Sequence, residues 1–405
     1  MNKISSCRVC GSKEIEQFLD LGKQPYANSL LQSPDEKEKL YNLSLSFCFN
    51  CSLVQLNHTA DPNELFTNYV WVTATSETAR KHAEVFCQQL ISKFKKSING
   101  LVLEVASNDG TFLLPFIKKG YKVLGIDPAT NIADLANSRG VETLAEFFGV
   151  KNAKKILKKY GPAEIIIARN VVPHVSSLHD FLKGLSICLD KDGLLAIEFH
   201  YAKKINDGLH YDSIYHEHLC YFTLKSLERL LHQYNFFIQD LTTSPISGGS
   251  LVIYARKGKI KEKAVVSNYR KAEKEDKLNQ FRTWELFAKR VNDHRQKFLK
   301  IINKFSGKSL IGYGASARSS TLLNYCGINS KIIPIIADKN PLKYKLFTAG
   351  THILIDSPDN VFKDKPDVVI ILAWNFSKEI ITMLQQKYNY KGNYIIPLPN
   401  NPKVL

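Results

Sequence analysis

The segment from Tyr211 to Phe222 concentrates side chains that can exchange protons. Its sequence is Tyr-Asp-Ser-Ile-Tyr-His-Glu-His-Leu-Cys-Tyr-Phe, so twelve residues hold three tyrosines, two histidines, an aspartate and a glutamate. Burying such groups without partners is costly, and stability alone does not require them to be gathered in one place. We therefore expect a cleft in which these groups act as general acids and bases.

The local backbone decides which side chains of this segment face the cleft. Where alternate residues point to opposite sides, Tyr215 and Glu217 share one side, and His216 and His218 share the other. Tyr211 and Tyr221 are typical of half-buried aromatic residues that keep a hydrated hydroxyl.

Two series of short apolar runs predict the elements that position this segment. In each series, helical stretches separate the runs, and this alternation predicts an α/β fold with a doubly wound parallel sheet, followed by a smaller Rossmann-like α/β domain. The strands are expected at 101–106, 122–127, 165–168 and 194–198 in the first series, and at 309–314, 332–338, 367–373 and 393–397 in the second.

Four cysteines near the start of the chain form two C-x-x-C pairs, Cys7 with Cys10 and Cys48 with Cys51. Paired thiolates at this spacing wrap one side of a zinc ion, and a second pair closes the site without an open position, as in structural zinc sites. Disulfides are the weaker alternative for a cytosolic chain. The other cysteines are expected to be small buried residues: Cys87, Cys188, Cys220 and Cys326.

Length and composition predict a globular protein of two or three domains, since the chain has 405 residues and is 44% hydrophobic. No apolar run approaches the roughly 18 residues of a membrane helix, and the first residues lack the apolar core of a signal peptide, so we expect a cytoplasmic protein. Of the formal charge of +17, +9 lies within Arg256–Lys300. Apolar residues at near-helical spacing there predict an amphipathic connecting helix with a solvated basic face.

A cofactor site is predicted where the first strand runs into Glu104-Val-Ala-Ser-Asn-Asp-Gly110 and the second ends at Asp127. Ligands of open α/β sheets bind at the carboxyl ends of the strands, where an acid can take ribose hydroxyls. A dinucleotide enzyme would show G-x-G-x-x-G, whereas Ala106, Asn108 and Gly110 give a turn without a phosphate cradle. This favours S-adenosylmethionine. The motif resembles that of class I methyltransferases, which implies cofactor-binding roles for Glu104, Ala106, Asn108, Gly110 and Asp127.

A second motif leaves alternatives open. Gly312-Tyr-Gly-Ala-Ser-Ala317, with Asp338 further on, matches a dinucleotide fingerprint. A helix that begins after such a turn offers backbone N–H groups to any phosphate, so a dehydrogenase or epimerase with a nicotinamide cofactor and a site for a nucleoside diphosphate are both compatible. So is a tight turn that merely needs small residues. A nucleic-acid methyltransferase or binding module, using the cysteine pairs and the basic helix, is a further alternative.

The sequence resembles, over nearly its whole length, the three-domain sugar C-methyltransferases, which methylate C3 of nucleotide-linked 4-keto-6-deoxyhexoses. The most specific of the six stretches that carry the resemblance are Tyr211–His218, with Tyr221–Phe222, and Leu372–Phe376. The other four stretches are the cysteine pairs with Leu21–Asn28 between them, Asn68–Trp71, Glu104–Gly110, and Gly312–Ala315 with Leu322–Gly327.

The resemblance implies a catalytic set of His218, Tyr215, Glu217, His174 and Tyr69. A C4 ketone makes the C3 proton acidic, so His218 would remove it and the enolate would attack the sulfonium methyl. Tyr215 and Tyr69 would donate hydrogen bonds to the developing oxyanion or fix the sugar. Glu217 would orient a ring or hold a sugar hydroxyl, and His174, at the end of the third predicted strand, would be an auxiliary proton handler. The remaining aromatic residues of the segment would support the site: Tyr211, His216 and Tyr221.

The resemblance also implies the domain order and the ligands. We expect a zinc-binding domain at 1–66, an S-adenosylmethionine-binding methyltransferase domain at 67–255, a basic helical connector at 256–305 and a C-terminal nucleotide-sugar-binding domain at 306–405. Gly314, Ser316 and Arg318 would lie near the substrate phosphates. The cofactors would be S-adenosylmethionine and structural Zn²⁺. The partner would be a nucleotide sugar, with no nucleic acid and no membrane, and the protein would be a monomer.

Two stretches depart from the family pattern. The residue before Gly248-Gly249 is Ser247, where a histidine is expected, and Ala315–Ser319 replaces Ala-Pro-Ala-Lys-Gly. Both departures fall where specificity is set in this family, so they leave the sugar and the nucleotide open.

Overall fold

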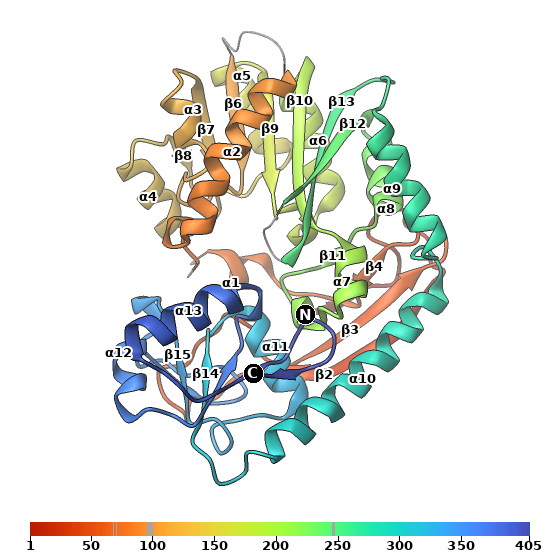
Figure 1. Ribbon diagram of the computed structural model, residues 1–405. Helices are drawn as coiled ribbons and strands as arrows, with labels where there is room; N and C mark the ends of the chain where they lie inside the picture. Colours follow the sequence, from red (N-terminus) through yellow and green to blue (C-terminus); the bar gives the residue numbers. More distant parts are fainter. Residues whose placement is uncertain (68, 70, 95–99, 245–247) are drawn as a thin grey trace.

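The computed structural model describes residues 1–67, 69, 71–94, 100–244 and 248–405. Asn68 and Val70 of the family stretch, and the departure at Ser247, lie outside the described residues. The methyltransferase sheet lies at one end of the molecule, the C-terminal α/β domain lies at the other, and a long helix runs along the side of both the N-terminal strands and the C-terminal domain (Figure 1).

The N-terminal region forms a four-stranded sheet in the order β11-β4-β3-β2, with a separate pair of short strands beside it. Its strand β11 comes from Tyr211–Phe222, the reactive segment, and lies antiparallel to β4, with Cys220 opposite Gln55 and Tyr221 opposite Val54. The proton-handling segment is therefore joined to the cysteine-bearing region by backbone pairing. The elements are β1 (Asn2–Lys3), β2 (Ile15–Gln24), β3 (Tyr41–Cys48), β4 (Val54–Leu56), β5 (His58–Thr59), β11 (Cys220–Tyr221) and helix α1 (Pro62–Phe66).

The central sheet has seven strands in the order β12-β13-β10-β9-β6-β7-β8. The five strands from β10 to β8 are parallel, and the four expected between 101 and 198 are among them. The sheet also has an antiparallel edge, formed by β12 and β13, that was not predicted. A connection too short for a helical crossover can join only antiparallel neighbours. The strands are β6 (Leu101–Val105), β7 (Lys122–Ile126), β8 (Thr143–Leu144), β9 (Ala163–Arg169), β10 (Leu189–His200), β12 (Phe236–Ser244) and β13 (Ser250–Lys257).

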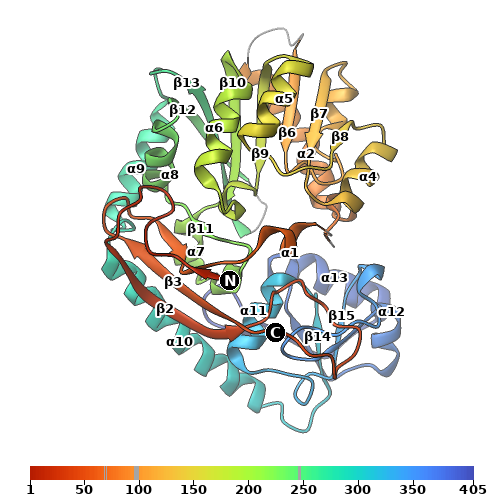
Figure 2. The same ribbon diagram turned by 180° about the vertical axis from the view of Figure 1, so that it is seen from behind.

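Helices cover both faces of this sheet, with α2 on one face and α5 and α6 on the other (Figures 1 and 2). Successive strand residues alternate between the two cores: Val102 and Ile165 pack with Phe86 of α2, whereas Leu103 and Ile166 pack in the other core. This two-sided burial explains the unbroken apolar strand sequences. The helices are α2 (Glu77–Phe94), α3 (Leu114–Ile117), α4 (Thr130–Ser138), α5 (Val150–Tyr160), α6 (Leu178–Cys188), α7 (Ala202–Gly208) and α8 (Leu224–His232).

The basic connector consists of two helices, α9 (Ala264–Glu275) and α10 (Phe281–Asn303), so the expected single helix is wrong. Lys277 takes a left-handed conformation (φ 53°) in the break between them. Leu278 is buried in this break rather than on a helix face. The apolar side of α10 packs on the N-terminal sheet, where Trp284 lies 5.9 Å from Phe18 between ring centroids. Core packing thus orients the connector, and its basic face is the outer one.

The C-terminal domain has six strands in the order β16-β15-β14-β17-β18-β19, all parallel except β19. The four expected strands are present, although the second begins at Ile335 rather than at 332. None of the helices in the described part of the chain is long and apolar enough to cross a membrane. The elements are β14 (Leu310–Tyr313), α11 (Ala317–Cys326), β15 (Ile335–Ala337), β16 (Leu354–Asp356), α12 (Pro358–Val361), β17 (Val368–Ile371), α13 (Ser377–Tyr388), β18 (Asn393–Ile396) and β19 (Lys403–Val404).

Candidate active site

The four N-terminal cysteines come together as predicted, with all sulfur atoms within 4.8 Å of one another. The Sγ atoms are 3.5 Å apart for Cys7 and Cys51, and 3.6 Å apart for Cys10 and Cys48, with no disulfide formed. Tetrahedral coordination at Zn–S distances of about 2.3 Å requires S···S separations of about 3.8 Å, so the cluster fits a zinc ion. The other four cysteines are free and buried, as expected.

The reactive segment is a turn rather than an extended strand. It begins with a short 3-10 helix, η3 (Tyr211–Ser213), after which the backbone N–H of His218 donates to the carbonyl of Tyr215 at 2.9 Å. This turn brings Tyr215 and His218 to the same side, so the expected alternation of side chains is wrong. The Tyr215 hydroxyl lies 2.8 Å from Nε2 of His218.

The tautomer of His218 follows from its second contact. Its Nδ1 lies 2.7 Å from the carbonyl oxygen of Ser213, which can only accept a hydrogen bond. Nδ1 therefore carries the proton, and Nε2 is left as the acceptor for the Tyr215 hydroxyl. Burial lowers the pKa of His218 to about 4 and raises the pKa of Tyr215 well above its usual value. At neutral pH the pair is thus a neutral imidazole and a protonated phenol.

His174 joins this pair. It ends the 3-10 turn η2 (Val172–His174) after β9, and its ring meets that of His218 edge-on, with centroids 4.6 Å apart. Burial, and then the neighbouring His218, lower the pKa of His174 well below its usual value. The backbone N–H of Leu219 donates to the carbonyl of Pro173 at 2.8 Å, which holds the two histidine-bearing turns together.

Glu217 is buried, and its carboxylate is held from outside its own segment. Asn28 Nδ2 donates to Oε1 at 2.5 Å, and the Tyr69 hydroxyl donates to Oε2 at 3.3 Å. Burial raises the pKa of Glu217 to about 7, although these two hydrogen bonds act to lower it. The ring of His218 is oriented by Ser213 and Tyr215, so orienting that ring is not the task of Glu217.

The other aromatic residues of the segment make structural contacts. His216 packs edge-on against Tyr26 and Tyr41, with centroid distances of 5.5 and 6.1 Å. The Tyr211 hydroxyl lies 3.0 Å from Nδ1 of His294, and Tyr221 belongs to β11.

The predicted cofactor turn leaves β6 in an unusual backbone conformation. Ala106 and Asn108 have φ values of 55° and 50°, and Gly110 has 74°. The turn is closed by Asp127, which accepts the N–H of Asn108 through Oδ2 at 2.9 Å and that of Ala129 through Oδ1 at 3.0 Å. Each oxygen keeps a second acceptor position, as a ribose hydroxyl would require. The turn therefore fits an adenosine cofactor without phosphates.

Glu104 is fully buried and belongs to an ionic network that sequence reasoning missed. Arg169 lies between two carboxylates, with Nη1 3.4 Å from Glu104 and Nε 2.9 Å from Glu198. Burial raises the pKa of Glu104 to about 8 despite the lowering effect of Arg169. The available signal was that three adjacent apolar strands each carry one charged residue near the carboxyl end.

A linker pinned to the cofactor turn positions Tyr69. The carboxamide Oδ1 of Asn108 accepts both N–H and O–H of Thr73 at 2.9 Å, and Asp109 accepts the N–H of Ala74 at 3.0 Å. Asn131 exchanges two hydrogen bonds with the backbone of Tyr69, at 3.2 and 2.9 Å. These contacts hold Tyr69 near the cofactor turn, and its hydroxyl reaches Glu217.

The C-terminal domain reaches the reactive segment through Arg318. Its guanidinium binds Asp212 with two contacts, Nε at 3.0 Å and Nη2 at 2.9 Å, and Trp374 Nε1 donates to the same carboxylate at 2.7 Å. Ser316 caps α11, and Gly314 has φ 97° where an added Cβ would lie 2.6 Å from Ala373. Asp212 and Trp374 were not predicted as site residues, although both lie in the family stretches.

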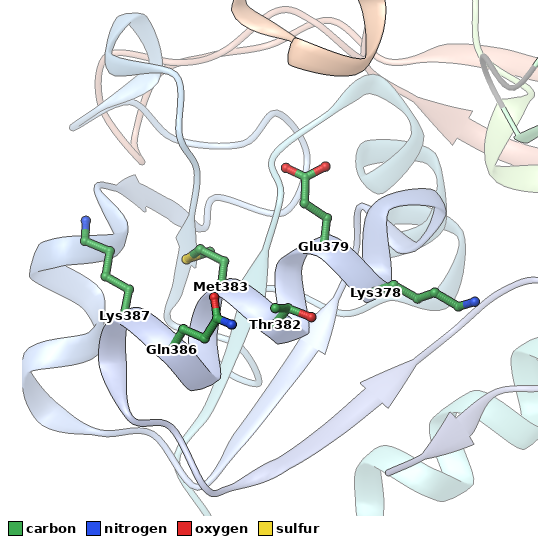
Figure 3. Close-up of a pocket in the computed structure, with 6 residues that line it drawn as sticks. All are labelled: Lys378, Glu379, Thr382, Met383, Gln386 and Lys387. Atoms are coloured by element: carbon green, nitrogen blue, oxygen red, sulfur yellow. The ribbon is translucent and has the colours of Figure 1, made fainter. Parts of the chain in front are cut away.

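A surface hollow lies along α13. Figure 3 shows that the side chains around it come from one helix, and none of them was predicted to belong to the site. They are Lys378, Glu379, Thr382, Met383, Gln386 and Lys387.

Three family models match the chain in succession. They are described as "Putative zinc binding domain" over residues 7–66, "Methyltransferase domain" over 79–241 and "C-methyltransferase C-terminal domain" over 245–399. The chain is also 31% identical over 408 residues to C-methyltransferase NovU of Streptomyces niveus, covering 99% of this chain and 97% of that protein.

Solved methyltransferases show a remote likeness. Magnesium protoporphyrin IX methyltransferase from Synechocystis, with bound SAM, has 13% identity and a TM-score of 0.34, covering 45% of this chain and 80% of that one. The plantazolicin methyltransferase BpumL, in complex with SAH, has 17% identity and a TM-score of 0.36, covering 45% and 85%. The family assignment rests on the sequence matches, which confirm the expected zinc-binding and methyltransferase domains. The chain belongs to the C-methyltransferases, enzymes that depend on S-adenosylmethionine and here carry an N-terminal zinc-binding domain.

Proposed function

We propose that the protein transfers a methyl group to C3 of a nucleotide-diphosphate-linked 4-keto-6-deoxysugar. The observation that carries this proposal is the Tyr215–His218 pair, in which Ser213 fixes the histidine tautomer and leaves Nε2 as a proton acceptor. A buried acceptor beside a protonated phenol suits the removal of a proton next to a ketone, because base and oxyanion donor are then adjacent.

The chemistry follows from these groups. Nε2 of His218 takes the C3 proton, and the C3–H electron pair becomes the C3–C4 double bond of an enolate. The Tyr215 hydroxyl turns from Nε2, and the Tyr69 hydroxyl turns from Glu217, to donate to the enolate oxygen, each contributing about 3 kcal/mol by analogy with oxyanion-hole donors. S-adenosylmethionine supplies an electrophilic methyl group when bound. Held at the Asp127 turn, it would give this methyl group to the enolate carbon and keep the electron pair of the methyl–sulfur bond, and His218 would release its proton to solvent.

The charge states of the three side chains support this division of labour. The low pKa of His218 keeps the ring unprotonated at neutral pH, so it is ready to accept. Once the ring is protonated, the hydrogen bond from Nδ1 to the Ser213 carbonyl stabilises the imidazolium. Glu217, whose pKa is about 7, holds a sugar hydroxyl, and His174 assists proton transfer next to His218.

The cofactor binds to the methyltransferase domain, and the nucleotide of the substrate binds to the C-terminal domain. Asp127 holds the cofactor ribose, while Glu104, Ala106, Asn108 and Gly110 shape the turn beneath it. In the C-terminal domain, the start of α11 offers backbone N–H groups for the nucleotide phosphates, with Gly314, Ser316 and Arg318 around it. Since Arg318 also binds Asp212 of the reactive segment, the nucleotide end of the substrate lies next to the groups that act on its sugar.

Incubation with dTDP-, GDP- and CDP-linked 4-keto-6-deoxysugars and S-adenosylmethionine tests the proposal. We expect one of them to gain the mass of one methylene group, with the new methyl at C3. Titrations with NAD and with S-adenosylhomocysteine serve as controls. Tight binding of NAD, without binding of S-adenosylhomocysteine and without methyl transfer, would contradict the proposal.

A further inference from the structure

Asn28 links the zinc-binding module to the reactive segment. It lies in the loop that follows β2, and its side-chain amide spans 189 positions of sequence to reach Glu217 Oε1 at 2.5 Å. Both ends of the loop are fixed. Gln24 ends β2, and Leu31 exchanges two backbone hydrogen bonds with Phe347 of the C-terminal domain, at 2.9 and 2.8 Å. The side-chain amide of Asn28 therefore lies on a loop that is held at both ends.

The surroundings of Glu217 make this contact consequential. Glu217 is only 3% exposed, and the described donors to its carboxylate are neutral, one on each oxygen. The titratable groups that face it are the phenols of Tyr69 and Tyr215. His218 lies beyond Tyr215, and His174 lies against His218. Because no described residue places a cation against this carboxylate, neutral donors determine whether it can stay ionised.

We propose that Asn28 is a positioning residue of the methyl-transfer site, supplied by the zinc-binding module to fix the orientation of the Glu217 carboxylate and keep it ionised. This inference rests on the proposed function, in which Glu217 accepts a hydrogen bond from a sugar hydroxyl. The geometry also explains why an amide suits position 28. A carboxylate there would share a proton with Glu217, and an apolar side chain would leave Oε1 without a donor.

The direct test needs no substrate. Infrared difference spectra of the full-length, zinc-loaded protein, recorded across a pH titration, report the carboxyl band of Glu217, which is identified by its loss in Glu217→Gln. In Asn28→Ala we expect the midpoint to rise by about one pH unit, because a hydrogen bond to the charged form is removed. Asn28→Asp keeps the size of the side chain and is expected to raise the midpoint further. Ser29→Ala, an exposed neighbour, is the matched control.

A second measurement relates the titration to turnover. The acid limb of the kcat/KM profile, which falls as pH drops through the pKa of Glu217, is expected to move to higher pH by the same amount in Asn28→Ala. Zinc content and melting temperature should match those of the Ser29→Ala control. Unchanged midpoints in both Asn28 variants would overturn the inference, even if the wild type methylates a keto-sugar. Shifted midpoints in a protein that methylates no keto-sugar would support the role of Asn28 and refute the proposed function instead.

Discussion

The two α/β domains have the same turn at the end of their first strand, but different side chains surround it. In the methyltransferase domain, Asp127 accepts the N–H of Asn108 at 2.9 Å and that of Ala129 at 3.0 Å. In the C-terminal domain, Asp338 accepts the N–H of Ala315 at 2.8 Å and that of Asn340 at 2.8 Å. Each acid follows the second strand of its domain, so one backbone design serves two unlike sequence motifs.

The acids that close the two turns differ in their partners. The hydrogen-bond donors to Asp127, in the part of the chain that the structure describes, are backbone N–H groups, and burial raises the pKa of this carboxyl. Asp338 has a lysine beside it: Lys343 Nζ lies 3.7 Å from its Oδ2 and 2.5 Å from the carbonyl of Ala315. In the first turn, the described arginines pair with Asp109 and Glu104 but not with Asp127, which keeps its free acceptor positions for a ribose. The lysine beside Asp338 suits a diphosphate instead. We therefore infer that the second turn is the anion-binding one.

The zinc-binding module contacts both the methyltransferase domain and the C-terminal domain. Its strand β4 pairs with β11 next to the reactive turn, and Leu31 pairs with Phe347 of the C-terminal domain. Glu38 adds contacts to the N–H of Gly350 at 2.8 Å and to His352 at 2.7 Å. Changes in this module should therefore affect both turns, whereas changes within one turn should affect that turn alone.

Loss of zinc should give the largest effect. In Cys48→Ser we expect stoichiometric zinc to be lost, the module to unfold and methyl transfer to fall by about a hundredfold or more, because structural zinc supplies folding free energy. Metal analysis, melting temperature and calorimetric affinity for S-adenosylhomocysteine and dTDP report these changes. Cys87→Ala, a buried cysteine outside the cluster, is the control and should retain zinc. A Cys48→Ser protein with wild-type stability and both affinities intact would refute the shared dependence on the module.

Reciprocal substitutions of the two acids should separate the turns. Asp127→Asn is expected to weaken S-adenosylhomocysteine binding by about 2 kcal/mol, roughly thirtyfold, and to leave dTDP or GDP binding unchanged. Asp338→Asn should weaken dTDP or GDP binding and leave S-adenosylhomocysteine binding unchanged. In both variants the new amide N–H faces backbone N–H groups that donate to the carboxylate in the wild type. Isothermal titration calorimetry with each ligand measures both. The comparison fails if Asp338→Asn weakens S-adenosylhomocysteine binding as much as Asp127→Asn does.

The charge difference alone should have the smallest effect. Lys343→Met keeps the length of the side chain and removes the cation, so we expect nucleoside diphosphate affinity to fall about fivefold, or about 1 kcal/mol, and to depend less on salt. Affinity for S-adenosylhomocysteine should not change. Lys339→Met, at a surface lysine that pairs with Glu379 at 3.4 Å, is the matched control. Equal losses in the two variants would mean that general surface charge, and not the turn, attracts the anion.

The sequence was informative where the chemistry is local. The spacing of Cys7 and Cys10 predicts a metal knuckle by itself, and Tyr215 and His218 meet because they share one turn. It was wrong about the direction of alternate side chains, since a single backbone hydrogen bond between residues 215 and 218 decides it. Partners that are distant in sequence were out of reach: no local pattern shows that Asn28 donates to Glu217.

The ionic contacts between elements teach the same lesson. Arg318 is expected near the phosphates, and no motif predicts that its guanidinium also binds Asp212, 106 positions away. Arg169 joins Glu104 and Glu198 across three strands, which follows from strand order rather than from any motif. Strand alternation predicted the two sheets but not the antiparallel hairpin β12–β13 or the break between α9 and α10.

Hydrogen exchange at C3 tests the central claim most directly. A nucleotide-linked 4-keto-6-deoxysugar is incubated in deuterated buffer with S-adenosylhomocysteine in place of the methyl donor, so that enolisation proceeds without methyl transfer. We predict that the wild type incorporates deuterium at C3. In His218→Asn we expect this exchange to be at least about a hundredfold slower, with ligand affinities unchanged. Exchange at the wild-type rate in His218→Asn would contradict the assignment of His218 as the base.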